Sequence, residues 1–199
     1  MAQPDERRWK KPRMVGWFDP SQLARAGLQA LLSTMLGSMI DTRRFGAVEG
    51  KDEDCILQLS PGDGESFSFD YLADTGDGWH ATYTIAYLLS SPQIKLTTGE
   101  TLPRADVVLC GGDQVYPVAS KLAYAQRLVW PFNEAARRLG QDHDEHALRE
   151  LYCTPGNHDW YDSLAAFTRR FCSGRRIGCF KTRQTRSYFV LKLPHHWQI

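Results

Sequence analysis

The stretch "ADVVLCGGD" (residues 105–113) is an apolar run that ends abruptly in two glycines and an aspartate. A short apolar run bounded by turn residues is typical of a strand that is buried on both faces, as in parallel sheets. Strand-like and helix-like segments alternate around it. We expect strands at 66–74, 148–157 and 187–193, and helices at 82–91, 119–130, 132–139 and 162–174. The alternation predicts an α/β layered fold with parallel strands.

The first third of the chain has a different character. Residues 1–66 are predicted to form a basic arm, an amphipathic helix and an irregular connection with one short strand at 55–60. Asp19 can cap the helix, expected over 19–44, and Pro20 fits its first turn. Together, residues 7–40 suit an anionic membrane surface. A disordered terminus followed by a core-facing helix is the simpler interpretation.

The composition limits the class of protein. Of the 199 residues 42% are hydrophobic and 24% charged, which is ordinary for a chain with a packed core. The five cysteines form no C-x-x-C pair, which argues against a disulfide framework and a structural zinc site. No signal peptide and no run of roughly 18 apolar residues is visible, so we expect a cytoplasmic protein, in one interpretation peripheral to a membrane. The mixture of cations and Trp9 in residues 7–13 would suit RNA as well as lipid headgroups, but it does not by itself predict a nucleic-acid partner.

Three predicted strands each end in a small polar cluster. These clusters are "ADTGDG" (73–78), "GGDQVY" (111–116) and "PGNHD" (155–159). Because sites in open α/β sheets form beyond the carboxyl ends of the strands, the three clusters should converge at one edge. The side chains that would meet there are Asp74, Asp113, Tyr116, Asn157 and His158.

This set of side chains is rich in oxygen donors and includes an imidazole. Such ligands suit manganese, iron or zinc. Asp113 follows two glycines and could bridge two metals. A metal pair roughly 3.5–4 Å apart can hold a hydroxide for attack and clamp the leaving oxygen of a phosphate ester.

The same motifs resemble those of the calcineurin-like metallophosphoesterases. "DTG" (74–76), "GDQVY" (112–116) and "GNHD" (156–159) occupy the first three motif places, and the resemblance covers about residues 67–193. It implies an α-β-β-α sandwich, with residues 67–199 as a metallophosphoesterase domain. It also implies a hydrolase that cleaves a phosphomonoester or phosphodiester with two divalent or trivalent metal ions.

The resemblance also assigns roles to individual residues. Asp74 and Tyr116 would bind one metal, Asp113 would bridge, and Asn157 would bind the other. His158 would steady the transition state or protonate the leaving oxygen, with Asp159 orienting it. Gly76 stands where a histidine is usual, as in the purple acid phosphatase branch, which compensates with a tyrosine at the place of Tyr116.

A second departure concerns the histidines that the family carries further along the chain. After "GNHD" only His195 and His196 remain, so we expect the first half of the sandwich, weak metal binding, and self-association through an exposed apolar sheet face. A catalytically inactive fragment, or a membrane-peripheral or scaffold interaction protein that keeps the fold, is the alternative. The basic stretch 169–192 could receive a phosphorylated substrate, form a solvated face, or be an edge that the missing half covers.

Overall fold

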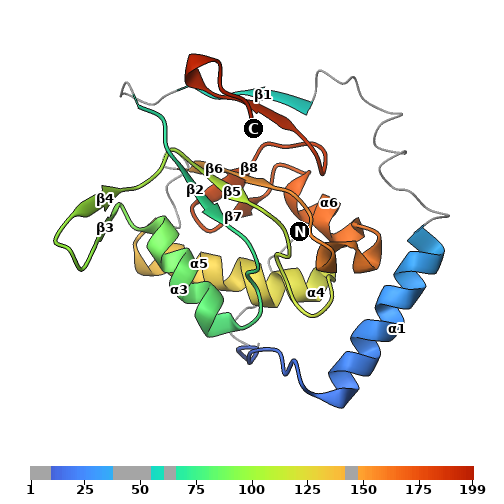
Figure 1. The fold of residues 1–199 in the computed structure, drawn as a ribbon. Helices are drawn as coiled ribbons and strands as arrows, with labels where there is room; N and C mark the ends of the chain where they lie inside the picture. Colours follow the sequence, from blue (N-terminus) through green and yellow to red (C-terminus); the bar gives the residue numbers. More distant parts are fainter. Residues whose placement is uncertain (1–9, 38–54, 61–65, 142–147) are drawn as a thin grey trace.

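A computed structural model describes residues 10–37, 55–60, 66–141 and 148–199 (Figure 1). Its main sheet has five strands in the order β2-β5-β6-β8-β7. The first four run parallel, and β7 pairs antiparallel with β8 at one edge. The strands are β2 (Phe69–Leu72), β5 (Val107–Cys110), β6 (Arg149–Cys153), β7 (Arg176–Ile177) and β8 (Phe180–Thr182). The prediction of an α/β fold with parallel strands is confirmed.

Helices cover one face of this sheet (Figure 1). The core between them joins Val108 of β5 and Leu151 of β6 to Ala86, Phe132 and Phe167 on the helices. These apolar side chains are buried, which is the main source of stability for such a layer. The helices are α3 (Trp79–Ser90), α4 (Lys121–Tyr124), α5 (Trp130–Arg138) and α6 (Ala165–Phe171).

The other face of the main sheet is covered by a small second sheet. There β1 (Ile56–Gln58) pairs in parallel with β9 (Val190–Lys192). Leu59 and Leu191 pack from this side on Val107, Leu109 and Tyr152 of the main sheet. The described residues are therefore layered as helices, main sheet and second sheet, in agreement with the expected sandwich type.

Helix α1 (Pro20–Gly37) projects from this body and contacts the 3-10 segment His158–Asp162 (Figure 1). Asp19 Oδ1 accepts a hydrogen bond from Ser21 N (2.8 Å) at its start, as predicted. The rest of the expected helix, residues 38–44, lies outside the described residues. One stripe of α1 is exposed rather than core-facing, formed by Leu28, Leu31, Leu32 and Met35. None of the described helices is long and apolar enough to cross a membrane.

Several predicted elements have different limits in the structure. The helix expected to begin at residue 82 begins at Trp79. The carbonyl of Gly78 closes its first turn, because it accepts hydrogen bonds from both the backbone N–H and the Oγ1 (2.9 Å) of Thr82. Pro131 separates the predicted helices 119–130 and 132–139 and was expected to stop or kink the chain there, but the helix continues through it. A π-helical segment, Ala125–Val129, widens the turn where the proline ring would meet the carbonyl four residues earlier. Helix α6 begins at Ala165 rather than at 162.

Two hairpin-like pairings were not predicted from the sequence. Strands β3 (Gln93–Lys95) and β4 (Thr101–Pro103) pair antiparallel around a turn at Gly99, whose φ is 90°. The β7–β8 pair turns at Gly178, with φ 59°. Strands this short carry no clear alternation of apolar and polar residues, so only the glycines indicate them.

Arg149 joins several elements at the amino-terminal ends of the strands. Its buried guanidinium donates to Ala105 O (2.6 Å), to Leu89 O, and to Asp70 Oδ2 at 3.3 Å. It also lies over the ring of Phe180, 4.9 Å from its centroid. Three strands and the end of α3 therefore share one cation.

Replacing Arg149 with Met should destabilise the fold, because the buried carbonyls and Asp70 would lose their donor. We expect the free energy of unfolding to fall by about 2–4 kcal/mol in urea denaturation. Arg183→Met is the matched control: Arg183 pairs with Glu150 at 2.5 Å, but its side chain is 56% exposed. That change should cost roughly 0.5 kcal/mol or less. Equal losses in both variants would contradict this role for Arg149.

Candidate active site

The loops that follow β2, β5 and β6 meet at the carboxyl edge of the main sheet. The hydroxyl of Tyr116 donates to Asp74 Oδ1 (2.5 Å), and Asp113 Oδ2 lies 3.2 Å from it. Asp113 Oδ1 accepts a hydrogen bond from the backbone N–H of His158 (2.9 Å). The predicted convergence of the three polar clusters is thus present for Asp74, Asp113, Tyr116 and His158.

Two glycines allow these loops to approach so closely. Gly112 has φ 119°, and a Cβ placed on it would lie 2.8 Å from Gly156 N. A Cβ on Gly156 would lie 2.1 Å from Asp113 Oδ1. Either side chain would push the loop after β5 away from the loop after β6, so the contact requires glycine at both positions.

The ring of His158 is held in one orientation. Its Nδ1 lies 2.6 Å from Pro117 O. A carbonyl only accepts, so Nδ1 carries the proton and Nε2 keeps the lone pair in the neutral ring. The rings of Tyr116 and Tyr161 pack edge-on against it, with centroids at 4.6 and 4.9 Å. The side chain is therefore fixed with one ring nitrogen available.

Asp159 has a different role from the one expected. Its fully buried carboxylate accepts hydrogen bonds from Tyr124 OH, Gly156 N (2.9 Å) and Gln114 N (3.3 Å). The expectation that it orients His158 is wrong, because Pro117 O holds that ring instead. Burial raises the pKa of Asp159, and its hydrogen bonds offset part of that effect. Asp159 therefore holds the loop after β5 and the loop after β6 together through their backbone N–H groups.

The donors for a metal are only partly assembled in the described residues. Asp74 and Asp113 meet at the Tyr116 hydroxyl, and an oxygen set of this kind fits one hard cation. Burial, and next the hydrogen bond to Asp74, raise the pKa of Tyr116, so the phenol is protonated. In the part of the chain that the structure describes, no three His, Cys, Asp or Glu side chains gather as a metal site needs.

Asn157 stands apart from this cluster. Its side chain is exposed, and its amide nitrogen lies 3.5 Å from Tyr161 OH. No hydrogen bond between the described residues joins the amide to Asp113. Of the predicted ligands, a second metal ion beside Asp113 would therefore have only Asp113 and Asn157.

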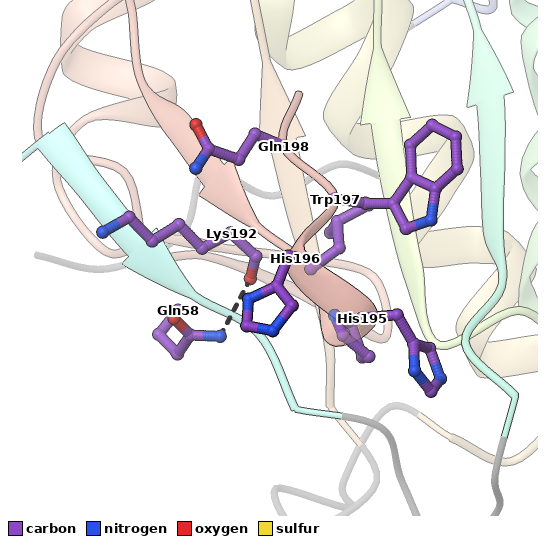
Figure 2. Close-up of a pocket in the computed structure, with 8 residues that line it drawn as sticks. Gln58, Lys192, His195, His196, Trp197 and Gln198 are labelled. Carbon is purple, nitrogen blue, oxygen red and sulfur yellow. Dashed lines mark hydrogen bonds between the residues drawn. The ribbon is translucent and has the colours of Figure 1, made fainter.

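The two C-terminal histidines lie elsewhere. His195 and His196 form a turn after β9 and line a surface pocket of about 450 Å³ with Gln58, Lys192, Trp197 and Gln198 (Figure 2). None of the Asp74, Asp113, Tyr116 and Asn157 side chains lines this pocket.

Trp17, which was not among the predicted site residues, borders the site. Its ring packs edge-on against Tyr116 (centroids 5.2 Å apart) and His158 (6.0 Å), while 42% of the residue stays exposed. The signal in the sequence was the aromatic pair just before the helix start, in "GWFDP". Residues 10–18 were placed in a disordered terminus by the simpler interpretation, but they pack on the domain.

Backbone contacts hold this segment in place. Val15 N donates to Asp77 Oδ1 (3.1 Å), and Trp79 N donates to Pro12 O (3.0 Å). Arg127 donates to Arg13 O (3.2 Å) and to Asp77 O (2.5 Å). Asp77 and Arg127 thus fasten the segment next to the site.

The geometry defines a class: an α/β protein with a carboxylate, phenol and imidazole cluster where three parallel strands end. A family model, calcineurin-like phosphoesterase, matches residues 67–190. This chain belongs to that family, whose members generally use divalent metals. Searches of curated proteins and of solved structures found no match.

Trp17→Ala should loosen the N-terminal segment, because the contacts with Tyr116 and His158 are lost. Losing an aromatic contact of roughly 1–1.5 kcal/mol should speed tryptic cleavage after Arg13 about tenfold, since cleavage follows local opening. The neighbouring Phe18, 95% exposed, provides the control, and Phe18→Ala should leave the rate unchanged. Similar rates in all three proteins would show that Trp17 does not hold the segment.

Proposed function

We propose that this chain is a metal-dependent phosphoesterase that hydrolyses phosphomonoesters or phosphodiesters. The observation that carries the proposal is the contact of Asp74, Asp113, Tyr116 and His158 across three loops. Family membership over residues 67–190 supports the reaction class. The cluster is partly exposed, so a substrate can reach it.

Asp74, Asp113 and Tyr116 would hold one metal ion, with Tyr116 releasing its proton on binding. Asp113 and Asn157 would contribute to a second. Manganese, iron and zinc suit these donors. Bound ions would neutralise the charge of the phosphate and lower the pKa of a water molecule.

His158 would act directly on the substrate. Because Pro117 O holds Nδ1–H, proton transfer takes place at Nε2. Protonated there, the ring would donate a hydrogen bond to a phosphate oxygen or a proton to the leaving oxygen. Asp159 would act indirectly, by fixing the loop that presents His158 through Gly156 N.

The exposed apolar stripe on α1 favours a second function. With Phe18 it forms an exposed apolar surface, and the basic residues Lys10, Lys11 and Arg13 precede it in the sequence. A membrane-peripheral interaction protein that retains the fold without turnover would use this surface. Activity that depends on the candidate site separates the two functions.

We expect wild type with manganese to hydrolyse an aryl phosphate ester, and His158→Ala and Asp113→Asn to lower kcat/KM about 100-fold or more. The matched controls are His80→Ala, on the exposed side of α3, and Asp106→Asn, whose carboxylate accepts from Ser68. Both should retain activity within about twofold, because neither touches the cluster. No turnover by a folded wild-type chain would exclude the enzyme and favour the interaction protein.

Metal dependence is tested by chelation. Treatment with a chelator should abolish hydrolysis, and added manganese should restore it. Tyr116→Phe should raise the manganese concentration for half-maximal activity about tenfold, because one oxygen donor is lost. Tyr87→Phe, a partly exposed tyrosine on α3, is the control and should leave it unchanged. Full activity in chelator would contradict a role for metal.

A further inference from the structure

The arginine side chains from α6 onward divide into two groups. Arg176 donates to Gly178 O (2.7 Å) and Gln141 O (2.8 Å), and Arg183 pairs with Glu150. Three others, by contrast, form no hydrogen bond or ion pair with any described residue. They are Arg169, Arg170 and Arg175. The basic stretch is therefore not one uniform solvated face.

These three arginines share one small cavity. Lys121, Tyr124 and Ala166 line it as well, and the volume of the cavity is about 40 Å³. The four cations come from the start of α4, the last turn of α6 and the loop that follows. Among the residues that the structure describes, no carboxylate lines the cavity. Separate segments of the fold thus bring four positive charges together with no negative one among them.

This arrangement favours a bound anion. Arg170 is partly buried, and burial followed by the charge of Arg175 lowers the pKa of its guanidinium. Lys121, Arg169 and Arg175 are exposed, so solvent reduces the repulsion among them, but like charges brought together still repel each other and a bound anion removes that cost. Arginine and lysine are also the side chains that bind phosphate best. The cavity has room for roughly three water molecules, which suits a phosphate group and excludes a nucleoside.

We propose that Lys121, Arg169, Arg170 and Arg175 form a phosphate-binding site separate from the candidate active site. Tyr124 connects the two. This residue lines the cavity, and its hydroxyl donates to Asp159, which holds the loops of Gln114 and Gly156. A phosphate here contacts the helices on which those loops rest. The proposal stands whether or not the chain is an enzyme.

The test is thermal unfolding of the full chain in a chelator-containing buffer, with phosphate added against chloride of equal ionic strength. Phosphate should raise the Tm of wild type by several degrees. Arg170→Gln should raise the Tm by about 2–4 °C without phosphate, because repulsion is relieved, and should lose at least half of the phosphate shift. Arg175→Gln, at an exposed position, should lose the shift in the same way.

Two controls locate the binding. Arg183→Gln removes a paired arginine of the same stretch and should keep the full shift. Asp113→Asn alters the candidate active site and should also keep it, whatever its effect on hydrolysis. A shift that survives in both Arg170→Gln and Arg175→Gln, or one that disappears in Asp113→Asn, would overturn the proposal.

Comparing the Tm shifts caused by inorganic phosphate and by glycerol phosphate shows which form of phosphate the site binds. A shift with inorganic phosphate alone assigns the site to the free anion. A shift with glycerol phosphate alone assigns it to a phosphomonoester. An equal shift with both shows that only the phosphate group is recognised, and no shift with either rules the site out.

Discussion

The buried carboxylate of Asp159 determines the arrangement of the candidate site. It accepts hydrogen bonds from the loop after β5, from the loop after β6 and from Tyr124 on the helix layer. Burying a charge is unfavourable unless it is hydrogen-bonded, so the three partners are needed together. Once they are in place, Asp113 and His158 are set side by side. The site therefore depends on a residue outside the cluster of Asp74, Asp113, Tyr116 and His158.

A second set of contacts joins the N-terminal segment to the same region. Asp77 lies three residues beyond Asp74 and accepts from Val15, while Arg127 donates to the backbone of both segments. The surroundings of the cluster thus include Trp17, which lies 57 residues before Asp74 in the sequence. The residues of the cluster lie within the family match, residues 67–190, but Trp17 beside them lies outside it.

The sequence predicted the parallel strands and the polar clusters because both follow from local patterns: apolar runs, glycines and strand order. The convergence of Asp74, Asp113 and His158 then followed from topology. The features that the sequence did not predict, such as the partners of Asp159, depend on contacts between residues far apart in the chain. Asp159 was assigned to His158 because they are adjacent, whereas its partners Gln114 and Tyr124 lie 45 and 35 residues away. Pro131 suggested a break that the π-helical segment avoids.

The pairing of β1 with β9 has a consequence for how the protein is made. Ile56 lies opposite Val190, so the two strands close a loop of more than 130 residues. During synthesis from the amino terminus, β1 has no partner until almost all of the described sheet has been translated. Closing so long a loop is entropically costly, and non-local strand pairs form slowly. The main sheet and its helices can be complete first, with the apolar surface of Leu109 and Tyr152 uncovered until β9 arrives. In that interval the nascent chain is most exposed to aggregation, and it is then that a chaperone would protect it.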